Sequence, residues 1–255
     1  MTIQSVKRAS QILSLFTKAR PSLGITEIGK ELRIHKATAQ GLVRTLHEEG
    51  FLSQNPETRK YQLGLKIYEL GMVLAGNIEI NQKASGPAHQ LALSSQHLVR
   101  IAIPDNHYAI VTLDAYPRTQ PFLTQSLGAR FPLYCTAMGK AILAYFTEAE
   151  TKKYFATTEL YGYTPNTITK KNDILRELAQ IRKIGYSLNR EEHLLARASI
   201  GAPIFGANKK PVAATCVVGE PSRILGSEKD KLIHMITTMA MELSQLMGYF
   251  PSHTV

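Results

Sequence analysis

Residues 1–66 contain three short segments in which apolar side chains recur at helical spacing. This spacing predicts three helices, over about 4–18, 27–33 and 36–49. Residues 33–35 form a tight connection between the second predicted helix and the third. Two short helices joined by a tight turn form a helix-turn-helix. The start of the chain is therefore expected to pack three small helices around one core.

The predicted helix ends coincide with residues that commonly break or cap helices. Pro21 and Gly24 break the chain after the first helix, and Thr26 is a good N-cap for the second. Gly50 lies where the third helix needs a C-cap. These residues support three separate helices in place of one long one.

Two short strands, at 51–54 and 60–63, follow the third helix and flank a polar turn that contains Pro56. Three helices followed by a β-hairpin make a winged helix-turn-helix. In such a module the third helix enters the major groove of DNA, and the hairpin lies along the backbone or the minor groove.

The positive charge of the chain is concentrated in the same segment. The chain has 30 Lys and Arg against 20 Asp and Glu, a formal charge of +10. Residues 1–66 hold eleven basic and five acidic residues, a net charge of +6, and the much longer remainder has a net charge of only +4. A concentrated basic end suits phosphate binding, because neutralising phosphates releases counterions. The alternative is an ordinary solvated basic surface.

The polar face of the third predicted helix and the turn of the hairpin supply the candidate DNA contacts. Glutamine can hydrogen-bond adenine edges, arginine can hydrogen-bond guanine, and threonine can hold a phosphate. The candidates are Lys36, Thr38, Gln40, Arg44, Thr45, Arg59 and Lys60. Gly41 is unusual here, because glycine inside a helix costs about 1 kcal/mol relative to alanine. It permits a close approach, either to DNA or to a neighbouring helix.

Several segments in both halves of the chain resemble one known family. In the first half they are SVKRA at 5–9, ITEI at 25–28, the helix at 36–46 and YQLG at 61–64. In the second half they are FPLYCTAMGKA at 131–141, EEH at 191–193 and SIGAPI at 199–204. Together they are similar to the isocitrate lyase regulator (IclR) family of bacterial transcription factors, in the same order along the chain.

This resemblance implies a fold and a function. The expected α+β architecture is a winged helix-turn-helix at 1–66, a linker helix at 67–82 and a GAF-like effector-binding domain at 83–255. The expected function is DNA-binding regulation, by repression, of a catabolic operon in response to a small organic, sugar or aromatic acid. The resemblance also implies a homodimer or dimer of dimers on a palindromic double-stranded DNA operator. The alternative function is constitutive DNA binding with a non-sensing C-terminal oligomerisation domain.

Four residues depart from the pattern of the family. The recognition helix usually has Ser where this chain has Ala37, and Arg where it has Gly41. The second half has Ala196 in place of a usual Gly, and Asn189 in place of a usual Asp. The Asn189 departure predicts tolerance of a more anionic or differently hydroxylated ligand.

The sequence after residue 64 predicts one helix that joins the two domains, followed by a domain of both helices and strands. Apolar residues at Ile67, Leu70, Val73 and Leu74 predict a helix that packs on the other protomer or, alternatively, on its own domain. Further helices are expected at about 83–97, 137–146, 148–155, 171–184 and 226–247. Strands are expected at about 99–103, 108–113, 120–125, 198–205 and 211–218. The absence of a regular βαβ order favours an α+β sensor fold.

The candidate effector contacts come from two sources. By resemblance to the family, they are Gly128, Ala129, Asn189 and Ser199. Residues 136–139 begin a predicted helix, whose N-terminal N–H groups suit a carboxylate, and the small side chains there leave room for a ligand near Ala137 and Met138. The simpler interpretations are a plain turn at 128–129 and an ordinary strand residue at 199.

Other candidate sites are weaker. Arg130 is a possible carboxylate clamp or a surface residue, and Cys135 has no recognisable base beside it. The cluster at 191–193 lacks a second set of metal ligands, so neither a metal nor a cofactor is expected. Gly139 and Lys140 end like a phosphate loop, but the remainder of that motif is missing. No acid, base and nucleophile converge, so the protein is not expected to be an enzyme.

The sequence also bounds the location of the protein. No apolar run approaches the roughly 18 residues that span a bilayer. The first residues lack the apolar stretch of a signal peptide. We therefore expect a cytoplasmic, nucleoid-associated bacterial protein with no membrane partner.

Overall fold

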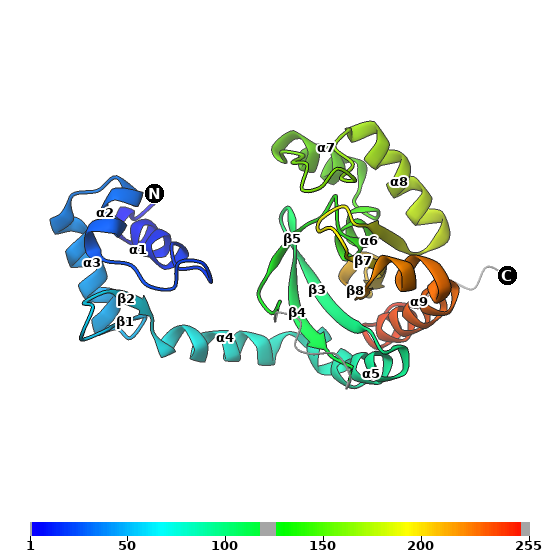
Figure 1. The fold of residues 1–255 in the computed structure, drawn as a ribbon, viewed down its shortest axis with the longest axis horizontal. Helices are drawn as coiled ribbons and strands as arrows, with labels where there is room; N and C mark the ends of the chain where they lie inside the picture. The colour runs from blue at the N-terminus through cyan, green and yellow to red at the C-terminus, as the bar shows by residue number, and fades with distance from the viewer. Residues whose placement is uncertain (1, 118–125, 251–255) are drawn as a thin grey trace. The chain divides into compact units, whose positions relative to one another are not determined.

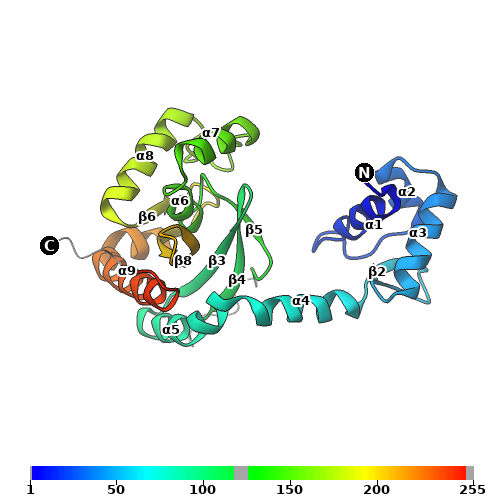
Figure 2. The same cartoon turned by 180° about the vertical axis from the view of Figure 1, so that it is seen from behind.

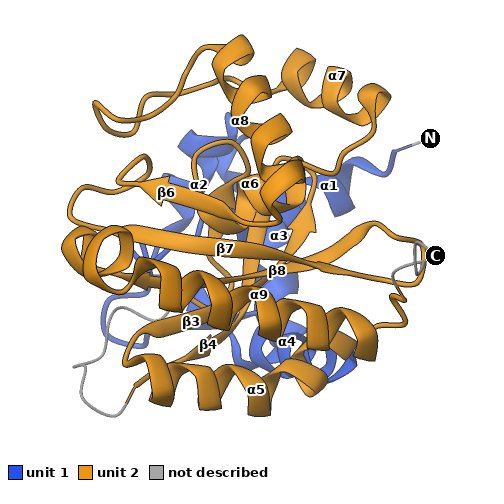
Figure 3. Cartoon of the chain, turned by 90° about the vertical axis from the view of Figure 1, so that its right-hand side faces the viewer, with its two compact units in different colours: residues 1–77 blue, residues 78–255 orange. Residues whose placement is uncertain are grey.

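The computed structural model describes residues 2–117 and 126–250. The chain forms two compact units, residues 1–77 and residues 78–255 (Figure 3). Each unit has its own hydrophobic core.

The first unit is a winged helix-turn-helix (Figure 1). Its elements are α1 (Gln4–Ser14), α2 (Ile25–Leu32), α3 (Lys36–Glu48), β1 (Leu52–Gln54) and β2 (Tyr61–Leu63). The two strands pair antiparallel, with Leu52 opposite Leu63. Side chains from α1, α2, α3 and the hairpin meet in one core that includes Ile12, Ile28 and Val43. The predicted architecture of this unit is confirmed.

The helix ends differ in detail from those predicted. The first helix ends at Ser14, because Thr17 and Arg20 exchange backbone hydrogen bonds and turn the chain early. The Thr26 prediction was wrong, since α2 begins at Ile25. The Glu27 carboxylate accepts a hydrogen bond from the Gly24 N–H at 2.6 Å, which stabilises an earlier start. Gly50 has φ of +78° and lies one residue beyond the C-cap of α3.

Helix α4 (Leu65–Asn77) completes the first unit and has no buried residue. Its apolar side chains are therefore exposed within the single chain. The larger ones are Leu65, Tyr68, Leu70, Met72, Val73 and Leu74. The linker helix was predicted at 67–82, whereas the structure begins it at Leu65 and ends it at Asn77. Its uncovered apolar surface is a feature of interacting helices.

The second unit is built on one antiparallel six-stranded sheet with the order β5-β4-β3-β8-β7-β6. Its strands are β3 (Leu98–Asp105), β4 (Tyr108–Ala115), β5 (Arg130–Pro132), β6 (Ser187–Arg190), β7 (Ala198–Phe205) and β8 (Pro211–Gly219). The central pair, β3 and β8, joins segments from opposite ends of the unit. This is the α+β arrangement expected from the sequence.

Helices cover both faces of this sheet. Within the second unit, Figure 3 shows α5 (Glu79–Ser95) and α9 (Lys229–Leu246) on one face, with the remaining helices of this unit on the opposite face. Figure 2 shows this second group, α6 (Ala137–Leu143), α7 (Glu148–Thr157) and α8 (Lys171–Ile184), from behind. A short π-helical segment, Arg223–Ser227, precedes α9.

Strand alternation divides the core between the two faces. On β8, Ala213 and Val217 belong to the cluster with α5 and α9, whereas Ala214 and Cys216 belong to the cluster with α6 and α8. Residues next to one another in the sequence therefore face different helices. The face with α6 contains the candidate effector site.

Some predicted elements of this unit need correction. The short edge strands β5 and β6 were missed, and three or four residues give too little alternation to detect. Helix α6 ends at Leu143 and not at 146, where the chain tightens into i→i−3 hydrogen bonds at Tyr145 and Phe146. The strand predicted at 120–125 falls outside the described residues. No helix of the described chain is long and apolar enough to cross a bilayer.

Candidate functional site

Helix α3 presents a polar, exposed face opposite its buried one. Ala39, Val43 and Leu46 are buried in the core of the first unit. Lys36, Gln40, Arg44 and Thr45 are exposed, and Thr38 is half-buried. The side chains predicted to contact DNA on this helix therefore share an accessible side.

The basic residues of the first unit that were predicted to contact DNA differ in whether they form ion pairs. Arg44 Nε lies 2.8 Å from Glu48 Oε1, one turn along the helix, and both side chains are more than half exposed. Lys60 Nζ lies 3.4 Å from Glu27 Oε2. Lys36 and Arg59 have no ion pair within the described residues. Arg59 lies in the turn of the hairpin, with φ of +58°.

The surroundings of Gly41 bear on whether this glycine permits a close approach of DNA or of a neighbouring helix. A Cβ atom built on Gly41 would meet no atom of the described chain within 4 Å. No neighbouring helix of the chain therefore requires a glycine at this position. A close approach of DNA remains a prediction.

The second unit contains a partly open cavity of about 270 Å³ between α6 and the sheet. Four residues predicted as effector contacts, Ala137, Met138, Asn189 and Ser199, line it. Gly128 and Ala129 are outside this lining, in a turn that pairs with Val111 of β4. The remaining lining residues are Leu98, Arg100, Ser126, Phe131, Thr136, His193, Leu194, Arg197, Ala198, Cys216 and Val218.

The N-terminus of α6 has fewer free backbone N–H groups for a ligand than the sequence predicted. Thr136 caps the helix, and its hydroxyl accepts a hydrogen bond from the Gly139 N–H at 3.1 Å. The same hydroxyl donates to the Pro132 carbonyl at 2.9 Å. With only seven residues, α6 also has a short dipole. Side chains are therefore the main polar groups of the cavity.

One wall of the cavity is a buried ion pair. Arg100 Nε donates to Asp114 Oδ1 at 3.0 Å, and the Asp114 side chain is 1% exposed. Arg100 also donates to the Ser126 hydroxyl at 2.6 Å, and its guanidinium lies over the Phe131 ring. These contacts fix the position of Arg100 between two strands and the start of β5.

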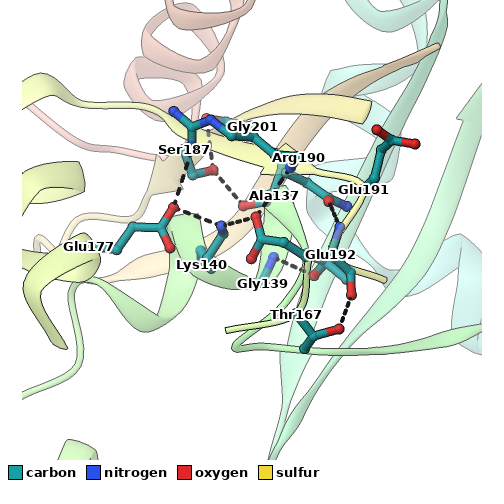
Figure 4. A network of polar contacts seen from close by, with 12 residues as sticks. Ala137, Gly139, Lys140, Thr167, Glu177, Ser187, Arg190, Glu191, Glu192 and Gly201 are labelled. Atoms are coloured by element: carbon teal, nitrogen blue, oxygen red, sulfur yellow. Dashed lines mark hydrogen bonds and ion pairs between the residues drawn. The ribbon is translucent and has the colours of Figure 1, made fainter. Parts of the chain in front are cut away.

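A second buried network joins α6 to Glu192 (Figure 4). Glu192 belongs to the segment 191–197, which supplies three lining residues of the cavity. Lys140 is fully buried, and its Nζ lies 2.6 Å from Glu192 Oε1 and 2.8 Å from Glu177 Oε1. Glu192 also accepts a hydrogen bond from the Arg190 N–H, and burial raises the pKa of its carboxyl. The Glu192 N–H in turn donates to Asn189 Oδ1 at 2.8 Å.

The structure also places the weaker candidates. Arg130 forms an ion pair with Asp105 and stacks on Tyr108, outside the cavity lining. The Cys135 thiol is buried, which raises its pKa to about 12. Of the cluster at 191–193, Glu192 pairs with Lys140 and His193 contacts Phe131. No group of three potential metal ligands occurs among residues 2–117 and 126–250.

Sequence reasoning missed several cavity residues. Arg100, Cys216 and Val218 lie on β3 and β8, and they reach the cavity because these distant strands pair. One signal was present: Arg100 interrupts an otherwise apolar strand, and Asp114 does the same on the next strand. Opposite charges in adjacent buried strands are typical of a cross-strand ion pair.

Comparison with known proteins adds evidence from the whole chain. Residues 5–56 match the model of the IclR helix-turn-helix domain, and residues 72–245 match that of the bacterial transcriptional regulator IclR C-terminal domain. The transcriptional regulator XynR of Escherichia coli is 31% identical over 97% of this chain and 98% of its own length. The glycerol operon regulatory protein of Streptomyces coelicolor is 29% identical over 96% of this chain and 97% of its own.

Solved structures agree with these relatives. The crystal structure of an IclR transcriptional regulator from Alicyclobacillus acidocaldarius matches with a TM-score of 0.86 and 26% identity, covering 97% of this chain and 100% of that one. Proteins of this family are DNA-binding transcriptional regulators and not enzymes. From its two domain matches, its relatives and its fold, this chain belongs to the IclR family of bacterial transcriptional regulators.

Proposed function

We propose that this regulator represses a catabolic operon and releases its operator when a small organic, sugar or aromatic acid enters the cavity of the second unit. The observation that carries the proposal is the combination of an exposed polar face on α3 with a cavity whose described lining contains two arginines and no carboxylate. The name of the glycerol operon regulatory protein, a relative at 29% identity, supports control of an operon.

On DNA, α3 lies in the major groove. Gln40 and Arg44 are exposed and long enough to hydrogen-bond base edges, whereas Lys36, Thr38 and Thr45 hold phosphates. Arg59, in the hairpin turn, extends the contact along the backbone. Lys60 contributes only when DNA displaces Glu27 from it.

The regulator acts as a homodimer or a dimer of dimers. The exposed apolar side chains of α4 support this assembly, because a single chain leaves them in water. Two winged helices related by a two-fold axis then bind a palindromic operator. Effector binding shifts the population of dimers away from the spacing that fits the operator.

The test combines selection of DNA from random duplexes with thermal unfolding against a panel of organic, sugar and aromatic acids. An acid at 100 times its dissociation constant stabilises the protein by about 2.7 kcal/mol. We expect one acid class to stabilise the protein and to weaken binding to the selected DNA. An acid that binds without changing DNA affinity, or no stabilising acid at all, would favour constitutive DNA binding with a non-sensing C-terminal domain.

Replacing Arg44 with alanine tests the DNA contact. If Arg44 binds a base, affinity for the selected DNA falls about tenfold or more, and specificity relaxes at one position of the site. If it binds a phosphate, affinity falls uniformly for all sequences and the dependence on salt becomes shallower. Unchanged affinity and salt dependence would contradict a role of Arg44 in DNA binding.

Glu48 should restrain DNA binding, because it competes with DNA for Arg44. Replacing Glu48 with glutamine removes the competing charge, since Arg44 Nε lies only 2.8 Å from Glu48 Oε1. We expect Glu48→Gln to raise DNA affinity several-fold in a fluorescence-anisotropy titration at low salt, where such exposed charges are least screened.

Glu49→Gln is the matched control for this prediction. Glu49 is exposed like Glu48, but it has no ion pair within the described residues. Both variants change the net charge of the protein by the same amount. Glu48→Gln should therefore exceed Glu49→Gln in its effect on affinity. Equal gains from the two variants would mean that net charge, and not release of Arg44, controls affinity.

A further inference from the structure

Two arginines line the effector cavity, and one of them is already neutralised. Arg100 is held by the buried carboxylate of Asp114 at 3.0 Å and by the Ser126 hydroxyl at 2.6 Å. Separating Arg100 from Asp114 would leave a buried charge without a partner, which is strongly unfavourable. Arg100 is thus a fixed part of the wall.

Arg197 differs from Arg100 in what its guanidinium contacts. It is half-buried, and one of its nitrogens donates to the backbone carbonyl of Ala196 at 3.0 Å. Within the described part of the chain it forms no ion pair. A guanidinium has five N–H donors in a planar fork that matches a carboxylate. Arg197 therefore brings an unneutralised positive charge and unused donors to the cavity.

The other polar groups of the cavity do not compete for this charge. No aspartate or glutamate is present among the described lining residues. Burial lowers the pKa of His193, so the imidazole is neutral at neutral pH. The oxygen of the Asn189 side chain accepts from the Glu192 N–H, which leaves its N–H₂ group to offer to a ligand. The lining therefore presents donors and positive charge to an incoming molecule.

We infer that Arg197 is the anion anchor of the cavity and binds the carboxylate of a small monocarboxylic acid through paired N–H···O bonds. The remainder of the ligand lies against Leu98, Phe131 and Val218, within a volume of about 270 Å³. This inference rests on the proposed function of the cavity as the effector site. It adds the chemical group that is recognised and the residue that recognises it.

The segment that carries Arg197 is held in place without a ligand. Glu191 and Ala196 both have left-handed backbone conformations, with φ of +61° and +57°. The Glu191 carboxylate closes the segment by accepting a hydrogen bond from the Ala196 N–H at 2.7 Å. Next to it, Glu192 is fixed by Lys140 (Figure 4). Such preorganisation reduces the entropy lost when an anion binds.

The test compares Arg197→Gln with Arg190→Gln. Arg190 is exposed, lies outside the cavity lining and loses only a long contact with Glu177, so it controls for the loss of one positive charge nearby. The probes are pyruvate, benzoate, 4-hydroxybenzoate and D-gluconate, each paired with its primary amide. Binding is measured by thermal unfolding and calorimetry, and operator release by anisotropy.

We expect an acid that binds the unaltered protein to lose about tenfold or more of its affinity in Arg197→Gln, because a charge-assisted hydrogen bond is lost. Its affinity for Arg190→Gln should be unchanged, and its amide should bind weakly to all three proteins. Arg197→Lys should retain part of the affinity, since the charge is kept and the planar fork is lost.

Two results would overturn the assignment while leaving the proposed function intact. One is an acid that releases DNA and binds Arg197→Gln as tightly as the unaltered protein. The other is an amide that binds as tightly as its acid. Failure of the proposed function gives a different pattern, in which an acid binds through Arg197 but leaves operator affinity unchanged. If none of the probe acids binds, the assignment of Arg197 as an anchor for small monocarboxylic acids is contradicted, and the wider acid panel still decides the proposed function.

Discussion

Lys140→Met is expected to lower the free energy of unfolding by about 3–5 kcal/mol, because it removes one partner from a buried ion-pair network. Lys140 is fully buried between Glu177 and Glu192, and each of these carboxylates has a second oxygen with no hydrogen bond among the described residues. The variant therefore leaves carboxylates buried without a counter-ion. Urea denaturation followed by circular dichroism measures the effect.

The pH dependence of this loss identifies its cause. Burial already raises the pKa of Glu192, and the charge and hydrogen bond of Lys140 are the largest influences that oppose this shift. Without Lys140 the folded-state pKa rises further above the unfolded value. A carboxyl with a raised folded pKa takes up a proton on folding, so its contribution to stability is largest below the unfolded pKa and is lost as pH rises through the folded pKa. The deficit of Lys140→Met should therefore be smaller at about pH 5 than at about pH 8.

Two further variants separate this network from ordinary surface ion pairs. Lys210→Met removes an exposed pair with Glu150 at 2.9 Å, and we expect a loss of about 1 kcal/mol or less. The double variant Lys140→Met with Glu192→Gln should be more stable than Lys140→Met alone, because one uncompensated charge is gone. A Lys140→Met protein as stable as Lys210→Met at every pH would show that water reaches the carboxylates.

Gly64→Ala is expected to destabilise the first unit by about 3 kcal/mol, because it forces a methyl group into backbone atoms. A Cβ atom on Gly64 would lie 2.1 Å from the carbonyl oxygen of Gly50 and 3.0 Å from its carbon. The Gly64 N–H donates to the Phe51 carbonyl at 2.8 Å, so the two segments cannot separate without losing this hydrogen bond. This contact joins the end of α3 to the start of α4.

Gly41→Ala is the matched control, with an effect of opposite sign. The same methyl group meets no atom within 4 Å, and removing a glycine from a helix stabilises it by about 1 kcal/mol. Thermal unfolding should show an early transition in Gly64→Ala, together with loss of DNA binding at the temperature where the first unit melts. An unaltered melting curve for Gly64→Ala would contradict the close contact. Weaker DNA binding by a stabilised Gly41→Ala would indicate that DNA approaches this glycine.

The sequence was most informative where structure depends on neighbouring residues. Helix α3 was predicted to within one residue at its end, because Ala39, Val43 and Leu46 repeat at helical spacing and Gly50 follows. Only four of the fifteen residues that line the cavity were predicted. Ala137 and Ser199 belong to motifs shared with a family, whereas Arg100 and Cys216 reach the cavity through pairing of β3 with β8. No local pattern encodes the register of such distant strands.

The ion pairs of Lys140 also could not be predicted from a local sequence pattern. From residue chemistry, the Gly139-Lys140 pair was considered as the end of a phosphate loop and Glu192 as a metal ligand, and the sequence did not indicate an ion pair between Lys140 and Glu192. The lysine lies 52 residues from Glu192 and 37 from Glu177 along the chain. A buried charge is recognisable only together with its partners, and these partners come from a different helix and a different loop.

The central position of β8 in the sheet also sets an order for folding during synthesis. The winged helix is complete in sequence by Gly64, and its contacts are short-range, so it can fold while the ribosome is still translating the second unit. Strand β3 must wait for β8, its partner from residue 211 onward, before the sheet can close. A nascent chain would thus bear a folded DNA-binding module before the cavity exists. If the cavity binds an effector as proposed, arrested or truncated translation products would occupy DNA without responding to it.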